Sequence, residues 1–290
     1  MPIDVDAVLS WEFPVAEVAY DERDSMLYAL GVGLGADPLD RRELRFVYEK
    51  ELVAFPTMAV VLGHPGPWFS DPRTGIDWVR AVHGEQELRI LAPLRPADDL
   101  RCTTRVTGVV DKGPGRGALV HWERELVRAD TAAPVAVASS VLFCRGDGGH
   151  GGSATGSAVS TVRPLPERPP DQLVDRTISP RAALLYRLSG DRNPLHADPD
   201  VAAEAGFDRP ILHGLCTFGM AAVALVAATG DADGSRLRGM GARFSAPSFP
   251  GETLRTEIWM DGDGASFRTY ALEREAIVLD GGWVEVVGHG

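Results

Sequence analysis

Between Gly214 and Thr229 the chain reads Gly-Leu-Cys-Thr-Phe-Gly-Met-Ala-Ala-Val-Ala-Leu-Val-Ala-Ala-Thr, a run that is apolar on nearly every side. We expect a helix that closes at Gly230, since glycine is favoured just beyond a helix end. A helix without a polar face must be buried, and one of this length cannot cross a bilayer. The run therefore predicts the central helix of a protein core.

Four strand-like segments follow that helix, separated by Pro-Gly, Asp-Gly and Gly-Gly turn signals. They span residues 237–246, 254–261, 266–275 and 277–287. Two short helices are expected before the central one, over Pro180–Leu188 with Ser179 as its cap and from Asp198-Pro199 to near Gly206. A buried helix followed by consecutive antiparallel strands predicts an α+β fold in which a curved sheet wraps round the helix.

The first half of the chain repeats this order, with a helix expected near residues 55–62 and strands near 84–93, 100–111, 117–129 and 134–145. Three short matches also recur in the same order. They are Leu27–Leu30 with Leu185–Leu188, Phe55–Met58 with Leu215–Phe218, and Ala92–Arg101 with Ala246–Arg255. Matches spaced by roughly 155 to 160 residues indicate a diverged duplication, and therefore two copies of one fold.

A segment rich in glycine and serine divides the chain near its middle. From Gly146 to Ser157, six of twelve residues are glycine and none is a large apolar side chain. Such a segment cannot offset its ordering entropy by burial, so we expect a flexible linker over residues 146–164. The length of 290 residues suits two domains of about 150. We place one domain at 1–145 and the other at 165–290.

Charge and cysteine content narrow the classes of function. The formal net charge of −12 disfavours nucleic acid and anionic membranes as partners. The three cysteines lie far apart without a Cys-x-x-Cys pair, which argues against a disulfide framework or a zinc site and favours a reducing compartment. The sequence has no apolar run long enough for a membrane span and no basic-then-apolar signal at its N-terminus. We therefore expect a cytoplasmic protein.

Residues suited to chemistry are concentrated just before the apolar run. Residues 186–196 read Tyr-Arg-Leu-Ser-Gly-Asp-Arg-Asn-Pro-Leu-His, so the acid Asp191, the amide Asn193 and the imidazole His196 lie within a few positions of one another. Neither a helix nor a strand would bring residues i and i+5 together. A loop can, because Gly190 allows the backbone to turn and the proline biases the preceding asparagine towards extended geometry.

This stretch, followed by Leu212-His213-Gly214, resembles the signature of the R-specific (type 2) enoyl-CoA hydratases, which belong to the MaoC-like group of hot-dog-fold proteins. The resemblance extends to Arg23–Gly33, His83–Gln86 and Lys112-Gly113, and so covers nearly the whole chain. It implies two hot-dog domains packed as a pseudo-dimer within one chain. The activity that it implies is reversible syn hydration of a trans-2-enoyl-CoA to the (3R)-3-hydroxyacyl-CoA, in fatty-acid or sterol side-chain metabolism.

The resemblance also assigns catalytic roles. Asp191 and His196 would hold one water between them, activating it for C3 and supplying the proton for C2. Asn193 would orient the loop or the water, and the N–H of Gly214 would donate to the thioester oxygen, because free N–H groups at a helix start favour negative charge. The structural alternative is that Asp191 caps a turn, His196 is satisfied at the surface and Gly214 merely allows tight packing. We expect His213 to be a buried histidine bonded to backbone.

The implied substrate contacts are His83, Gly84 and Phe244, which would line the CoA and acyl surface, and Lys112 with Gly113, which would hold a coenzyme phosphate. Because CoA is an anion and the chain is acidic overall, cations must gather locally to bind it. The candidate cations are Lys112, Arg116, Arg209 and Arg243. The alternative is that these are scattered, solvated charges.

The first half departs from the catalytic pattern. In place of the Gly-Asp-Arg-Asn-Pro-Leu-His string it reads Gly31-Val-Gly-Leu-Gly-Ala-Asp37-Pro-Leu-Asp40. Asp40 takes the position of the histidine, and two acids without an imidazole could not run the same acid–base cycle. We expect this half to be catalytically silent and to bind the acyl chain and CoA.

The expected reaction uses no metal and no redox cofactor, with the CoA thioester as the substrate. The expected partners are that acyl-CoA and a second copy of the chain in a homodimer, with no nucleic acid and no membrane. Two other interpretations stay open, a hot-dog acyl-CoA thioesterase and a non-catalytic subunit that binds acyl thioesters. A metal site built from Asp191, His196 and His213 is a third alternative.

Overall fold

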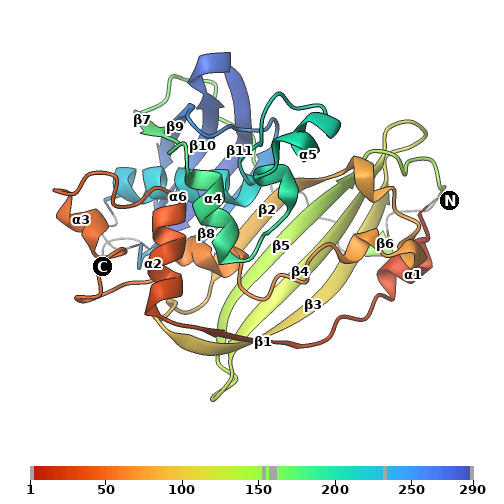
Figure 1. Ribbon diagram of the computed structural model, residues 1–290, viewed down its shortest axis with the longest axis horizontal. Helices are drawn as coiled ribbons and strands as arrows, with labels where there is room; N and C mark the ends of the chain where they lie inside the picture. The colour runs from red at the N-terminus through yellow and green to blue at the C-terminus, as the bar shows by residue number, and fades with distance from the viewer. Residues whose placement is uncertain (1–2, 152–154, 157–161, 231–233, 288–290) are drawn as a thin grey trace.

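The computed structural model describes residues 3–151, 155–156, 162–230 and 234–287. Its strands form one antiparallel sheet, whose path runs β1-β3-β4-β5-β2-β8-β11-β10-β9-β7, with β6 paired to β3 (Figure 1). The strands are β1 (Ala16–Tyr20), β2 (Ala81–Ile90), β3 (Asp98–Asp111), β4 (Ala118–Arg128), β5 (Pro134–Cys144), β6 (Thr155–Gly156), β7 (Gln172–Thr177), β8 (Leu237–Phe244), β9 (Thr253–Asp261), β10 (Gly264–Ala271) and β11 (Ala276–Val286).

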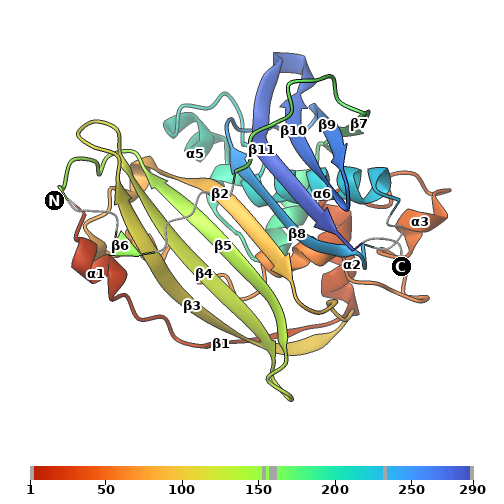
Figure 2. The ribbon, with the colours of Figure 1, turned by 180° about the vertical axis from the view of Figure 1, so that it is seen from behind.

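The sheet consists of two like halves joined edge to edge. Strands β2 to β5 form the first half and β8 to β11 the second, and β2 pairs with β8 across the joint, with Leu88 opposite Met240. The helices α2 and α6 lie on the same side of the sheet. In Figure 2 they lie behind the strands, on the side away from the viewer. This is the α+β double hot-dog architecture that the sequence predicts.

The helices are α1 (Val5–Leu9), α2 (Glu22–Gly31), α3 (Arg41–Leu44), α4 (Ala182–Tyr186), α5 (Pro199–Glu204) and α6 (Gly214–Ala228). The predicted central helix is α6, which is buried at every position from Cys216 to Val226. The helix expected from Pro180 is shorter than predicted: α4 begins at Ala182, and the Ser179 hydroxyl accepts the N–H of Arg181 at 3.2 Å. Strand β10 also ends before residue 275, because a 3-10 turn follows Ala271.

The counterpart of α6 in the first half is only one 3-10 turn, η1 (Pro56–Val60). It lies inside the predicted range 55–62 but does not continue, since the sequence Gly63-His-Pro-Gly-Pro67 cannot extend a helix. The guanidinium of Arg124 on β4 stabilises its end by donating to the carbonyls of Val60 and Leu62 at 2.7 and 2.8 Å. The first-half sheet is therefore covered by a much shorter element than the second.

Contacts between aligned residues support the predicted duplication. Tyr28 of α2 and Tyr186 of α4, which align in the repeat, are both buried, and their ring centroids lie 5.8 Å apart. They belong to one apolar core that draws on both halves of the chain. The aligned tyrosines thus meet where the two copies pack together.

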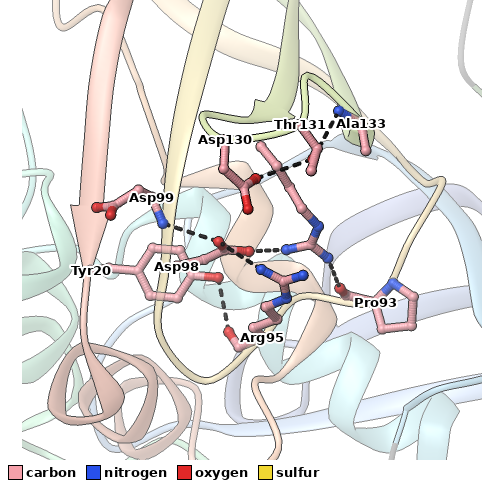
Figure 3. A network of polar contacts seen from close by, with 9 residues as sticks. Tyr20, Pro93, Arg95, Asp98, Asp99, Asp130, Thr131 and Ala133 are labelled. Carbon is pink, nitrogen blue, oxygen red and sulfur yellow. Dashed lines mark hydrogen bonds and ion pairs between the residues drawn. The ribbon is translucent and has the colours of Figure 1, made fainter.

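A polar network closes the first-half sheet at the start of β3 (Figure 3). Asp98 forms an ion pair with Arg128 at the end of β4, and the same guanidinium donates to the carbonyl of Pro93 at 3.1 Å. Tyr20 of β1 donates its hydroxyl to the carbonyl of Arg95 at 2.9 Å. The network ties the loop before β3 to β1 and β4.

The second half repeats part of this network. Glu252, just before β9, pairs with Arg274, just after β10, at 2.5 Å, and Arg274 donates to the carbonyl of Pro247 at 2.6 Å. In the predicted alignment of 92–101 with 246–255, this acid and this proline match the acid and the proline of the first-half network. Equivalent contacts at aligned positions indicate that the two halves are copies of one fold.

The predicted linker begins with an anchored segment. The carboxylate of Asp111 accepts the N–H groups of Gly149 and Gly151 at 2.7 and 2.9 Å, and β6 pairs with β3. Residues 152–154 and 157–161 of the linker lie outside the described residues. All three cysteines are free and buried, as the absence of a disulfide pattern predicts. Within the described ranges, no helix is both long and apolar enough to cross a membrane.

Candidate active site

The loop after α4 has the shape that its sequence predicts. Gly190 adopts a φ of 130°, which other residues rarely reach, and Asn193 is extended with ψ 125° before the proline. The amide oxygen of Asn193 then caps the 3-10 turn at residues 194–196 by accepting the N–H of Leu195 at 3.0 Å. These turns fold the end of the loop back on its beginning.

The loop brings Asp191 and His196 together, and His213 joins them. The nearest side-chain oxygen or nitrogen atoms of the three residues all lie within 4.8 Å of one another. A water that makes two hydrogen bonds of about 2.8 Å can span such a gap. The meeting of acid and imidazole is as expected from the sequence, and their catalytic roles stay a prediction.

The tautomer of His196 is set by a contact from outside the loop. Its Nδ1 lies 2.9 Å from the carbonyl of Ile211, and because a carbonyl only accepts, Nδ1 must carry the proton. The lone pair of Nε2 is then available as a base. Burial lowers the pKa of His196, whose side chain is 8% exposed, so the imidazole stays neutral near pH 7.

His213 packs against His196 and contacts the backbone of the loop. Its ring stacks on His196 with centroids 3.7 Å apart, and its Nε2 donates to the backbone carbonyl of Asp191 at 3.1 Å. Burial lowers its pKa from 6.5 to about 4. The expected buried histidine bonded to backbone is confirmed. The sequence interpretation missed the role of Tyr186, whose ring lies 5.1 Å from this imidazole, although Tyr186 opens the motif.

The alternative that Asp191 and His196 have purely structural roles holds for Asp191 in part and fails for His196. Asp191 does cap a turn, because its Oδ1 accepts the N–H of Asn193 at 3.1 Å, but this bond occupies one carboxylate oxygen only. His196 is buried, so the alternative of a satisfied surface histidine is wrong. Asn193 caps the following turn and keeps its amide N–H groups for a second contact, so its two suggested roles are compatible.

The same three side chains form a candidate metal-binding group, and their geometry suits an ion poorly. Imidazole lone pairs lie in the ring plane, and the rings of His196 and His213 are stacked with 29° between their planes. Two nearly parallel rings 3.7 Å apart cannot both direct a lone pair at one ion between them. The Nδ1 atom of His213 is also buried, and it has no hydrogen-bond partner among the described residues.

The start of α6 lies beside this pair, because its first residue, Gly214, follows His213, whose ring stacks on His196. A Cβ atom on Gly214 would lie 3.2 Å from the ring of Phe244, so glycine is also required for close packing. The ring of His83 lies 4.8 Å from Phe244. The residues expected to bind substrate, His83 and Phe244, thus form one wall above the helix start.

The remaining expected substrate contacts lie next to that wall. Gly84 is the extra residue of a β-bulge in β2, and a Cβ there would touch Phe143 at 3.4 Å. Lys112, in the turn with Gly113 (φ 97°), places its ammonium 4.8 Å from the centre of the same Phe143 ring. Contacts through Phe143 therefore join the Lys112 turn to the His83 wall.

The three candidate arginines differ in whether another side chain of the protein already contacts them. Arg243 forms two hydrogen bonds of 3.0 and 3.2 Å to Glu85 across the β2–β8 joint, and half of its side chain stays exposed, so its role as a cation for CoA stays a prediction. Arg209 lies over the ring of Phe249, 4.9 Å from its centre. Arg116 is exposed in the same turn as Lys112. The sequence could not distinguish these cases, because the pairing of Arg243 depends on the register between the halves.

The matching loop of the first half uses its acids as caps. Asp37 accepts the N–H of Leu39 at 2.9 Å, and Asp40 caps α3 while pairing with Arg42 at 2.9 Å. Among the residues that the structure describes, neither carboxylate forms a hydrogen bond or ion pair with an imidazole. This agrees with the expectation that the first half carries no acid–base pair.

The buried histidines predict acid sensitivity. Because the pKa of His213 falls from 6.5 unfolded to about 4 folded, the unfolded chain binds the proton first as pH drops. Stability should therefore be lost as pH falls through this window, by about 2 kcal/mol between about pH 7 and about pH 5 from His213 alone. His83, whose pKa burial lowers to about 4, acts in the same direction.

Urea denaturation at a series of pH values measures this effect. The free energy of unfolding should decline with a slope that appears below about pH 6.5. A flat profile down to about pH 5 would show that these imidazoles are not held neutral by the fold.

Comparison with known proteins agrees with the observed fold. Residues 161–281 match the MaoC like domain, and residues 18–146 match the MFE-2 hydratase 2 N-terminal domain. A solved MaoC-like dehydratase from Phytophthora capsici superposes with a TM-score of 0.87 at 34% identity, over 99% of this chain and 100% of that one. The fold and the site together define a double hot-dog hydratase of acyl thioesters.

Two curated relatives narrow this class. The enoyl-CoA hydratase ChsH3 of Mycobacterium tuberculosis is 41% identical over 99% of both chains. The 3-hydroxyacyl-thioester dehydratase Y of the same organism is 40% identical over 92% of this chain and 93% of its own length. The chain therefore belongs to the MaoC-like, R-specific (type 2) enoyl-CoA hydratase family, and it is an enzyme of that class.

Proposed function

We propose that this protein catalyses the reversible syn hydration of a trans-2-enoyl-CoA to the (3R)-3-hydroxyacyl-CoA, with Asp191 and His196 as its acid–base pair. The observation that carries the proposal is their placement within 4.8 Å of each other, beside the start of α6. His196 presents an unprotonated Nε2 there because the Ile211 carbonyl holds the proton on Nδ1.

The two acceptors suit a single water molecule. Nε2 of His196 and the Asp191 carboxylate can each accept one hydrogen of that water, which directs an oxygen lone pair towards C3 of the enoyl group. As the C3–O bond forms, one acceptor takes the proton and the π electrons move to C2 and the thioester. The proton is then returned to C2 from the same side. Addition from one side is syn, and the atoms of one water balance the reaction.

The helix start supports the charge that develops. Negative charge appears on the thioester oxygen during addition, and the N–H of Gly214 is the first donor of α6. A preorganised donor of this kind contributes roughly 3 kcal/mol to a developing oxyanion. His83 and Phe244 wall this position, so the thioester would lie between them and the Asp191–His196 pair.

The first half would hold the rest of the substrate. Its inner sheet face has only the short turn η1 where the second half has α6, and we place the acyl chain on this side. Lys112 and Gly113 would contact a phosphate of CoA, near Gly84. Asn193 would orient the water or the loop. In this division of labour, residues 1–145 bind, residues 165–290 catalyse, and residues 146–164 link them.

The proposed reaction needs no cofactor, since the water and the two side chains supply every atom and proton. The substrate fits fatty-acid or sterol side-chain metabolism. We place the protein in the cytoplasm, where its three buried thiols would stay reduced, and expect a homodimer.

A hydration assay tests the proposal against its rivals. The purified chain should remove the enoyl absorbance of crotonyl-CoA without releasing a thiol, and chiral analysis should find the (3R) product. Release of free CoA, detected with a thiol-reactive dye, would instead identify a thioesterase. Binding of the thioester without either change would identify a non-catalytic subunit.

A further inference from the structure

His213 contacts both residues of the proposed acid–base pair, although the proposed reaction does not use it. Its ring stacks on His196 with centroids 3.7 Å apart, and its Nε2–H donates to the backbone carbonyl of Asp191 at 3.1 Å. Gly214, the first residue of α6 and the proposed oxyanion donor, follows it directly in the chain. One buried side chain therefore touches or adjoins every group to which the proposed reaction gives a role at the thioester.

The two contacts of His213 restrain different movements. The stacked ring, with 29° between the ring planes, opposes rotation of the His196 imidazole about its Cβ–Cγ bond. The carbonyl of Ile211 holds that imidazole at one atom only, Nδ1, so the ring could still tilt about this contact without the stack. The hydrogen bond to the carbonyl of Asp191 holds the backbone next to Gly190, where the chain turns with a φ of 130°. A tilt of the ring moves Nε2, and a shift of the backbone moves the carboxylate.

His213 can restrain its neighbours because it is fixed itself. Its side chain is 1% exposed, and the ring of Tyr186 lies 5.1 Å from its own. Its carbonyl accepts the N–H groups of Cys216 and Thr217 at 3.0 and 3.1 Å in the first turn of α6. Tyr186 belongs to the main apolar core, where it packs against Tyr28 of the first half. The restraint on the loop is thus anchored in the core of the protein.

The residue type suits both contacts at once. A phenyl ring could stack but not donate, and an amide could donate but not stack, whereas an imidazole protonated on Nε2 does both. Burial lowers the pKa of His213 to about 4, so its ring stays neutral. It therefore adds no like charge beside His196 when that residue takes a proton from the water.

We infer that His213 is a positioning residue, which keeps Nε2 of His196 and the Asp191 carboxylate at the separation that one water can bridge. This inference rests on the proposed function and adds to it a residue that acts through the acid–base pair. A displacement of about 1 Å in a catalytic group can lower a rate by about 10²-fold. The loss should appear in kcat and not in KM, because the expected substrate contacts, His83 and Phe244, lie on other elements.

Two variants of the full-length protein each remove one contact. His213→Phe keeps a ring that can stack on His196 but has no N–H, whereas His213→Gln keeps an N–H that can reach the Asp191 carbonyl but has no ring. His213→Phe is also combined with Asp191→Asn, and His213→Gln with His196→Gln. The measured quantities are kcat and KM for crotonyl-CoA, with thermal unfolding to confirm that the variants are folded.

A second buried histidine supplies the matched control. His121 on β4 is 7% exposed and has no part in the proposed chemistry. His121→Phe makes the same change of side chain in a similarly buried place, so it should keep the wild-type kcat. A loss in His213→Phe that His121→Phe does not share is then specific to the site.

Each His213 variant should lower kcat by about 10- to 10²-fold and leave KM within about threefold. In the combined variants the further loss should fall below about threefold, because residues that act as a unit are not additive. Where one variant does not fold, the other still tests its own contact.

Three results would overturn the inference and leave the proposed function intact. They are a kcat within about twofold of the wild type in the folded His213 variants, a raised KM at unchanged kcat, and losses that multiply fully in the combined variants. A raised KM would assign His213 to substrate binding, and full multiplication would give it a role independent of the pair. A wild-type protein that does not hydrate crotonyl-CoA would overturn the proposed function and this inference together.

Discussion

Asp191→Asn and His196→Gln should each lower the rate of crotonyl-CoA hydration by roughly 10²-fold or more, because each removes one of the two groups that handle the water's proton. The asparagine keeps an oxygen that can accept the Asn193 N–H, so the loop should keep its turn. The glutamine cannot act as a base at any accessible pH. Initial rates at saturating and limiting substrate measure the loss in kcat and in kcat/KM.

A nearby acid provides the matched control for this experiment. Asp208 is exposed in the loop after α5 and plays no part in the proposed chemistry, so Asp208→Asn should retain the wild-type rate. Thermal unfolding should show all three variants folded. If either Asp191→Asn or His196→Gln hydrates crotonyl-CoA near the wild-type rate, the role assigned to that residue is wrong.

Gly214→Pro should lower kcat by roughly 10²- to 10³-fold by removing the N–H proposed to stabilise the oxyanion. Proline is well tolerated at the first position of a helix, where the N–H has no partner within the helix. The preceding residue, His213, already has φ −59° and ψ 134°, which suits the position before a proline. The substitution therefore removes a donor while remaining compatible with the backbone of α6.

Gly214→Ala separates this electronic effect from the steric one. Both variants add a Cβ atom 3.2 Å from the Phe244 ring, but only alanine keeps the N–H. The alanine variant should lose less than about tenfold in kcat, because the ring need move only slightly. Equal losses in the two variants would assign the effect to crowding and remove the Gly214 N–H from the mechanism.

Much of the fold could be read from local patterns. The buried run at 214–229, the turn signals between strands and the repeated segments each depend on neighbours within a few residues, and each corresponds to an observed element. The predicted helix boundaries were less accurate, because the residues at which a helix begins and ends depend also on its packing. The helix at residue 180 begins two residues late, and the first-half helix is a single turn, because glycine and proline follow it.

In the loop at residues 190–196, too, some features follow from the local sequence and others from distant contacts. Gly190 and the proline after Asn193 specify the turns that bring Asp191 to His196, and both signals are local. The contact that makes His196 a base is with the carbonyl of Ile211, which the motif does not include. The fate of Arg243 likewise depended on Glu85, a residue from the other half of the chain.

The amino-acid sequence alone determined the two-copy architecture, the acid and imidazole of one copy and the absence of the imidazole from the other, because periodicity, turn chemistry and residue identity are properties of short segments. Only the tertiary structure decided the protonation site of His196, its stacking on His213 and the partner of Arg243. Each of these depends on the distance and orientation of groups far apart in the chain. Strand register and helix packing fix those distances, and no short segment encodes them.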